Sequence, residues 1–179
     1  KNLNAYYYWS ENKWAELEVV KPRSPGFLTI DPASFQPMVR NDEVRHSSAV
    51  VFESDNTFLT VTNRDLGERI IAPVSLPHGS TMEELVIYYM DSDNQDNLRV
   101  TLMRKEFARD NESVFTWESN GAAPVVRDHS FNNFNGMETI DLEKYSYRLM
   151  VEFDIDNKTI EEPAEARQRL YGVRIKYHE

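Results

Sequence analysis

The alternation of hydrophobic and polar positions is clearest over residues 69–105, where it predicts three successive strands. The first, residues 69–76, ends at a Pro-His-Gly-Ser sequence (residues 77–80), a turn signal because Pro fixes φ and Gly permits positive φ. In the second, residues 84–90, both alternating sets of side chains are apolar or aromatic. This pattern predicts a central strand in a sheet whose two sides are both at least half covered.

A short acidic loop separates the second strand from the third. Residues 91–97 read Asp-Ser-Asp-Asn-Gln-Asp-Asn, and the chain then returns through Leu98, Val100 and Leu102 with polar residues between them. A period of two on both sides of a short loop is typical of an antiparallel β-hairpin. We therefore expect residues 84–90 to pair with the strand that begins at Leu98.

Further strands are predicted on both sides of this region. Residues 49–52 and 57–62 form two short apolar segments joined by a turn, and residues 114–117 form another. The clearest alternations come last, at residues 147–155 and 171–177. With little helix-forming sequence, these strands predict an all-β fold: an antiparallel β-sandwich, jelly-roll-like, with a short N-terminal arm.

Two segments interrupt this regular pattern. Residues 125–137 are rich in Asn, Asp and Ser and predict a long loop with an irregular strand. Residues 161–169 have helix-forming composition, with Pro163 tolerated in a first turn, so they predict either a short helix or a charged loop.

The first 26 residues differ from the rest, which predicts an N-terminal aromatic arm (residues 1–26) ahead of a single β-sandwich domain (residues 27–179). The arm contains four consecutive aromatic residues: Tyr6, Tyr7, Tyr8 and Trp9. Such a cluster is typical of a strand or arm packed on a neighbouring surface, and a ligand-stacking platform is the alternative. Ser10 as an N-cap then predicts a short helix through Leu17.

Composition narrows the classes of partner. The chain has 30 acidic and 20 basic residues and a net charge of −10, which argues against binding to nucleic acid or to an anionic membrane surface. No apolar run approaches the ~20 residues that a membrane-spanning helix needs, so no direct membrane insertion is expected. The chain has no cysteine, which excludes disulfides and cysteine-based zinc sites.

Five short segments form a linked set: FQP at residues 35–37, APVSLPHGS at 72–80, YYMDSD at 88–93, LRVTL at 98–102 and YGVRIKY at 171–177. Together they resemble a pattern in exported bacterial β-sandwich modules of unknown function. Those modules carry an APV-LP-G-A turn, an aromatic strand ending in Asp-x-Asp and a terminal G-x-R-I-x-Y strand. The resemblance covers about residues 27–177. It implies one sandwich domain and no catalytic residues. It also implies an extracytoplasmic setting (secreted, cell-surface or periplasmic), which fits a mature chain that has lost its signal peptide.

The acidic loop offers candidate metal ligands: Asp91, Asp93, Asp96 and Asn97. Their oxygen atoms are hard ligands of the kind that Ca²⁺ prefers, and calcium is the one cofactor to consider. The glycine and closing glutamate of an EF-hand are missing at the expected spacing. In the structural alternative these side chains accept hydrogen bonds from nearby backbone N–H groups in the loop.

Exposed tryptophans are candidates for stacking on sugar rings. Trp117 is followed by Glu118, Ser119 and Asn120, a polar fringe that suits carbohydrate, and Trp9 and Trp14 are further candidates. In the structural alternative, a Trp at a strand end packs into the core or along an edge. Trp117 and Asn120 are therefore the carbohydrate-binding residues of this hypothesis.

Catalysis has little support in the sequence. Separate segments hold the four histidines: His46, His78, His129 and His178. They lack the His-x-His or His-Glu-x-x-His spacing, and there is no Gly-x-Ser-x-Gly elbow, phosphate-binding glycine loop or dinucleotide fingerprint. With 30 acidic residues, chance carboxylate pairs are unavoidable, so a glycosidase-like pair cannot be identified. We expect no enzymatic activity.

We interpret the chain as a non-catalytic, exported surface, adhesion or assembly component that acts through protein–protein contacts. The expected partner is another protein chain, either a second copy or a larger surface complex, and the contacting residues are Tyr6, Tyr7, Tyr8 and Trp9. Strand addition by the arm would draw affinity from its backbone and specificity from alternate aromatic side chains. A carbohydrate-binding module is the alternative. A hydrolase is a third class, which requires a deep pocket with a perturbed titratable group.

Overall fold

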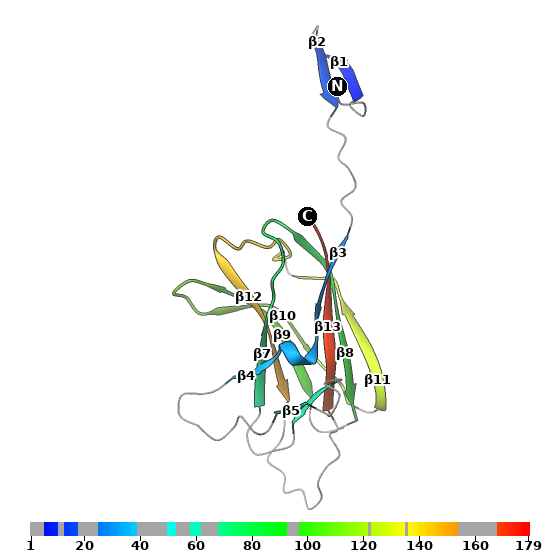
Figure 1. Ribbon diagram of the computed structural model, residues 1–179, viewed down its shortest axis with the longest axis vertical. Coiled ribbons are helices and arrows are strands. Elements are labelled where there is room, and N and C mark those ends of the chain that lie inside the picture. The colour runs from blue at the N-terminus through cyan, green and yellow to red at the C-terminus, as the bar shows by residue number, and fades with distance from the viewer. Residues whose placement is uncertain are drawn as a thin grey trace, which may run out of the picture.

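The computed structural model describes residues 6–10, 13–17, 25–38, 50–52, 58–61, 68–92, 97–121, 123–134, 136–153 and 168–179. Within these residues the chain forms three β-sheets, and the two larger ones face each other, so the predicted antiparallel β-sandwich is confirmed (Figure 1). None of the helices formed by these residues is long and apolar enough to cross a membrane.

One sheet has five strands, in the order β10-β9-β12-β7-β4. Their bounds are β4 Gln36–Pro37, β7 Glu68–Pro73, β9 Leu98–Glu106, β10 Asn111–Glu118 and β12 Tyr145–Phe153. The short strand β4 and the strand β10 are the two edges of this sheet.

The other sheet has six strands, five of them in the order β11-β8-β13-β6-β5, with β3 pairing β13 off that path. Their bounds are β3 Gly26–Ile30, β5 Val50–Phe52, β6 Leu59–Val61, β8 Thr81–Asp91, β11 Ala123–Phe131 and β13 Gln168–His178. A 3₁₀ turn, η1 Pro32–Ser34, carries the chain from β3 across to β4. The Asp31 side chain caps it by accepting a hydrogen bond from the Ser34 N–H at 3.1 Å.

The core lies between the sheets and follows the alternation of the sequence. On β8, Leu85 and Ile87 are fully buried on the core side, and on β12 Leu149 and Val151 are fully buried opposite them. Val86, on the outer side of β8, is also buried at 4% exposure. The prediction of a central strand with both sides at least half covered is therefore confirmed, since β8 lies between β11 and β13.

The predicted hairpin between β8 and β9 is wrong. Strand β8 pairs with β11 and β13, whereas β9 pairs with β10 and β12, so the two strands belong to opposite sheets. The acidic segment between them therefore crosses from one sheet to the other. The Pro77–Ser80 turn, closed by a Ser80 N–H to Pro77 C=O bond of 3.1 Å, likewise lies between strands of different sheets. Alternation specifies which face of a strand is buried, but not which strand lies beside it.

The remaining expectations are met unevenly. Two short strands are confirmed as β5 and β6, which pair antiparallel, and the last two long strands are confirmed as β12 and β13. For residues 125–137 the predicted irregular strand is confirmed as β11, whose register shifts between Ala123 and Arg127, but the predicted loop is shorter than expected because β11 pairs with β8 through to Phe131. Residues 161–167 lie outside the described part of the chain.

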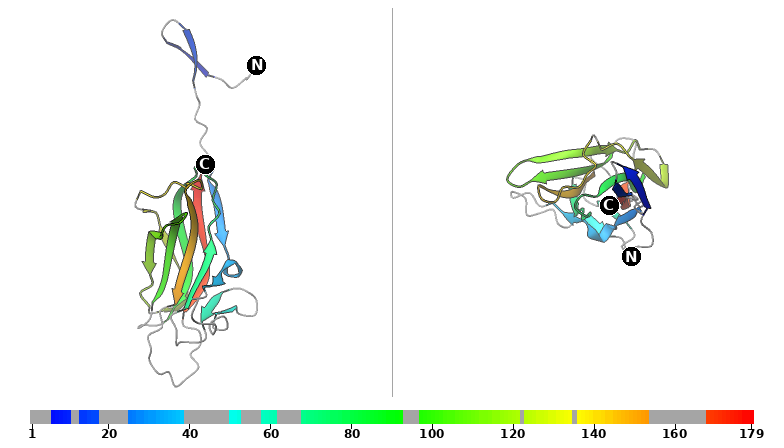
Figure 2. Two further views of the ribbon diagram at one scale, coloured as in Figure 1. Left: turned by 90° about the vertical axis from the view of Figure 1, so that its left-hand side faces the viewer. Right: turned by 90° about the horizontal axis from the view of Figure 1, so that it is seen from above.

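The arm contains two strands, β1 Tyr6–Ser10 and β2 Lys13–Leu17, which pair antiparallel as a separate hairpin (Figures 1 and 2). The predicted helix through Leu17 is therefore wrong. The register places Trp9 opposite Trp14, with Ser10 opposite Lys13 beside the turn. Cross-strand pairing of aromatic residues favours a strand over an isolated helical turn.

Candidate functional site

Trp117 lies on β10, an edge strand, and faces the space between the two sheets. It pairs in register with Val100, a fully buried core residue. Its ring meets two rings from the opposite sheet: Tyr89 of β8, edge-on at 4.7 Å between centroids, and His129 of β11, stacked at 5.0 Å with an interplanar angle of 21°. Trp117 and His129 are both only partly buried.

A second ring stack lies beside the first. Phe115, two residues before Trp117, stacks on Phe131 of β11 at 4.6 Å, and Phe134 meets both rings edge-on. The two edge strands β10 and β11 therefore meet through ring stacks. We call the residues Phe115, Trp117, His129 and Phe131 the aromatic seam. Phe115 is buried at 3% exposure, so the Trp117–His129 end is the more open one.

The backbone after Trp117 is fixed by a buried polar cluster. The Ser119 N–H donates to the Leu98 carbonyl at 2.9 Å, and the Leu98 N–H donates to the Ser119 hydroxyl oxygen at 2.8 Å. That hydroxyl in turn donates to the Asp91 carboxylate, which is 1% exposed. Asn120 follows, exposed, and Gly121 then takes a positive φ of 67° that favours glycine. The predicted pair Trp117 and Asn120 therefore lies at one anchored strand end.

The Trp117–His129 pair includes a hydrogen-bond donor that no described residue uses. Across the described residues, no acceptor takes the Trp117 indole Nε1–H. Arg127, which is in register with Tyr89 on the neighbouring strand, forms no ion pair there either. An aromatic body whose donor is not used by any described residue, three residues before an exposed amide, suits a ligand that is partly apolar and rich in hydroxyl groups.

The predicted metal ligands do not form a described cluster. Asp91 is buried against Ser119, and Asn97 is partly buried at the start of β9. Asp93 and Asp96 lie outside the described residues. Among the residues that are described, no three His, Asp or Glu side chains are grouped so that they could hold a metal ion. Calcium binding by this loop stays a prediction.

The predicted contact residues of the arm, Tyr6, Tyr7, Tyr8 and Trp9, lie on β1, where only the backbone is described. The structure therefore places them at register positions of the hairpin, opposite Leu17, Glu16, Ala15 and Trp14 respectively. Their role in partner binding stays a prediction.

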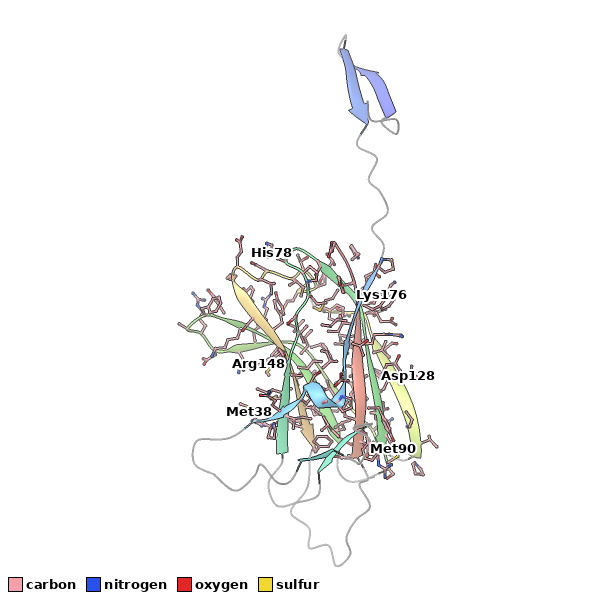
Figure 3. The ribbon with its side chains drawn as sticks, viewed as in Figure 1. Met38, His78, Met90, Asp128, Arg148 and Lys176 are labelled. Carbon is pink, nitrogen blue, oxygen red and sulfur yellow. The ribbon has the colours of Figure 1, made fainter. Side chains whose placement is uncertain are left out.

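The described histidines occupy separate places. His78, in the Pro77–Ser80 turn, accepts a hydrogen bond at Nδ1 from the Leu142 N–H at 3.1 Å (Figure 3). His129 lies in the aromatic seam, and His178 lies 3.1 Å from Glu83 near the C-terminus. His46 lies outside the described residues.

No known protein-family model matches the sequence, and no curated protein matches it either. Among solved structures, a xylan-binding module (CBM15) superposes with a TM-score of 0.50 at 9% identity, covering 86% of this chain and 97% of that chain. The CBM36-1 domain of a multidomain xylanase, from the hindgut metagenome of Trinervitermes trinervoides, gives 0.47 at 10% identity, covering 86% and 98%. The coat protein of Tobacco streak virus gives 0.41 at 10% identity, covering 90% and 91%. At 9% identity, the match to the xylan-binding module shows a shared fold and no more.

Sequence reasoning found Trp117 and Asn120 but missed their neighbours Tyr89 and His129. The alternation of β8 placed Tyr89 on the same face as Leu85 and Ile87, which was the available signal. His129 carried no such signal, because residues 125–137 were predicted to form a long loop with an irregular strand and no buried face was assigned to them.

Proposed function

We propose that this chain is a non-catalytic, exported module that binds polysaccharide at the open end of its aromatic seam. The observation that carries the proposal is the Trp117–His129 stack, which is partly exposed and whose Trp117 lies on the strand that leads to the anchored Ser119 and the exposed Asn120. Sugars present apolar C–H patches bordered by hydroxyl groups, and an aromatic edge with a free N–H donor complements both.

His129 defines how a sugar would approach. It covers one face of the Trp117 ring, and Tyr89 meets the same ring edge-on. A sugar therefore contacts the exposed border of the stack, where the indole Nε1–H and the Asn120 side chain can donate hydrogen bonds, rather than lying flat on a bare tryptophan. A site of this kind favours modest affinity.

The fold is consistent with this function without establishing it. The xylan-binding module shares the sandwich over 86% of this chain, which makes xylan a reasonable first polysaccharide to test. Fold alone does not imply function, so the ligand rests on the seam.

Affinity electrophoresis through gels containing soluble xylan tests the proposal. Asn120→Ala removes an exposed amide, and Trp117→Phe keeps a ring while removing the Nε1–H donor. Each should weaken retardation by about threefold to tenfold, as loss of one or two hydrogen bonds predicts. Phe107→Ala is the matched control, because Phe107 is 72% exposed at the turn between β9 and β10 and is no part of the seam. A wild-type chain that no polysaccharide gel retards would refute the proposal.

Assembly through the arm is the second candidate, and the β1–β2 hairpin favours it. A two-stranded sheet is at best marginally stable alone in water, and both of its outer edges are unpaired in the described structure. We propose that a protein partner, such as a second copy, completes it. Light scattering should then show an oligomeric full chain and a monomeric chain beginning at Pro25, with and without millimolar calcium. Two monomers would reject self-association.

A further inference from the structure

The outer face of the six-stranded sheet carries a second group of aromatic and cationic side chains, centred on Arg174. Core residues Val173 and Ile175 flank Arg174 on β13, so Arg174 points away from the core. It is in register with Val86 of β8 and Thr29 of β3. This face is therefore built from the two long central strands and β3 (Figure 1).

Two aromatic rings lie beside the Arg174 guanidinium. Its Cζ lies 5.7 Å from the centre of the Phe27 ring and 5.9 Å from that of Tyr88. Phe27 is 57% exposed, and Tyr88 is partly buried. We call Phe27, Tyr88 and Arg174 the arginine platform. A second arginine of this sheet, Arg169, lies 4.4 Å from the Phe58 ring.

Arg174 has no carboxylate partner among the described residues, although the chain carries a net charge of −10. Carboxylates do pair with other arginines of the chain: Arg69, Arg99, Arg104 and Arg109. Lys176, two residues along β13, pairs with Glu83 at 2.6 Å (Figure 3). The Arg174 Nε is buried and has no hydrogen-bond partner within the described residues.

The chemistry of the platform selects a particular kind of ligand. A guanidinium presents a planar fork of donors that fits a carboxylate, and an exposed aromatic ring fits the apolar face of a sugar. The two occur together in an oligosaccharide that carries a uronic acid. Glu84 and Asp128 lie on the same face at register positions of Lys176 and Tyr88, so a densely charged polyanion would meet repulsion.

We propose that the arginine platform binds a largely neutral sugar chain that carries isolated uronic-acid groups. Arg174 holds the carboxylate, and Phe27 contacts the sugar ring. This inference rests on the proposed polysaccharide-binding function and adds a ligand class and a second contact surface to it. In the structural alternative, the Arg174 stem merely covers the apolar outer side of β8.

Titration calorimetry of the full chain with three probes tests the inference. The probes are a neutral xylo-oligosaccharide, the same oligosaccharide bearing one glucuronic acid, and an oligogalacturonate. Wild type should prefer the singly charged probe over the neutral one by about tenfold, the value of one charge-assisted contact. Arg174→Gln should abolish that preference while leaving the affinity for the neutral probe within about twofold.

Three variants complete the test. Arg174→Lys keeps the charge but not the fork, so it should recover only part of the preference. Phe27→Ala should weaken both xylo-oligosaccharides, because it removes an exposed ring. Arg99→Gln, on the outer face of the other sheet, is the matched control and should leave the preference unchanged.

The outcomes separate the two proposals. Equal binding of the neutral and singly charged probes by wild type overturns the arginine platform while polysaccharide binding stands. Binding of none of the three probes overturns both. Preference for the oligogalacturonate also overturns the inference, because the face would then bind any dense negative charge. Equal binding of a poly-glutamate peptide overturns it as well, because the face would then bind acidic protein segments as well as sugars.

Discussion

One row of charged residues on the outer face of the five-stranded sheet differs from Arg174, on the outer face of the six-stranded sheet, in the partners of its arginines. On the five-stranded sheet, one cross-strand row alternates in charge over four strands: Arg69 of β7, Glu152 of β12, Arg99 of β9 and Glu118 of β10. Arg99 lies 2.5 Å from Glu118 and 3.4 Å from Glu152, and Arg69 pairs with Glu152 from the other side. On the six-stranded sheet, Arg174 has two aromatic rings and, among the described residues, no acid.

The difference separates stabilisation from recognition. Opposite charges placed directly across strands stabilise the pairing of those strands, and the hydrogen bond to Glu118 raises the pKa of Arg99. Such a row has little capacity left for a ligand. An arginine that the fold leaves without an acid contributes less to stability and remains available for binding.

The largest effect is expected where β13 is bulged beneath the arginine platform. Gly172 has a φ of 140°, and a Cβ there would lie 3.0 Å from the Ile30 carbonyl oxygen. Gly172→Ala should lower the free energy of unfolding by about 2 kcal/mol, because a side chain at that φ is strained. Urea denaturation measures it. Gly79→Ala is the control: φ is also positive, but nothing lies within 4 Å, so a smaller loss of about 1 kcal/mol is expected. Equal losses for the two variants would show that the close approach to the Ile30 carbonyl oxygen adds nothing to the strain at residue 172.

The next effect breaks the charged row. Glu152 is 12% exposed and lies between Arg69 and Arg99. Glu152→Gln should cost about 1–2 kcal/mol, because it removes charge-assisted hydrogen bonds from two arginines. The loss should shrink in high salt, measured by urea unfolding at two salt concentrations. A variant as stable as wild type at low salt would show that the charged row does not contribute to the free energy of unfolding.

Arg174→Gln is expected to do much less to stability. Its free energy of unfolding should lie within about 0.5 kcal/mol of wild type. The substitution breaks no ion pair among the described residues, and the buried Nε–H without a partner there is either lost or replaced by the glutamine amide N–H. The same urea measurement checks it. A loss as large as that of Glu152→Gln would assign Arg174 a structural role.

The smallest effect concerns acid. Glu83 lies 2.6 Å from Lys176, and the hydrogen bond from Lys176 holds the pKa of the Glu83 carboxyl below its usual range. A lowered pKa in the folded chain contributes stability above the unfolded value, which is lost as pH falls through the folded value. Glu83→Gln should therefore flatten the fall in melting temperature below about pH 4.5, slightly because the pair is solvent-screened. Identical pH profiles would contradict this.

The alternation of apolar and polar residues correctly predicted which face of a strand is buried, but it did not predict which strands pair. It placed Leu85, Ile87 and Tyr89 on one side of β8, and those side chains are buried in the core. It also suggested that β8 pairs with β9, whereas the chain crosses between sheets there. Adjacent strands in a sandwich can pair or lie in opposite sheets with the same alternation, so topology depends on non-local contacts.

The candidate site was predicted in the same partial way. Trp117 and Asn120 were identified because a tryptophan followed by polar residues is a local feature. His129 was not, because its contact with Trp117 joins two edge strands of different sheets. Arg174 was seen in the alternation of β13, but its lack of an acid partner is a property of the assembled sheet.

Nuclear magnetic resonance of the full chain, during titration with a xylo-oligosaccharide, is the most direct test of polysaccharide binding at the seam. The chain has three tryptophans, so its spectrum should contain three indole N–H signals, two from the arm (Trp9 and Trp14) and one from the seam (Trp117). The Trp117→Phe variant assigns the third signal by its loss. If sugar binds at the seam, the Trp117 signal should shift saturably while the other two stay in place. An unmoved Trp117 signal, with or without movement of the arm signals, would contradict it.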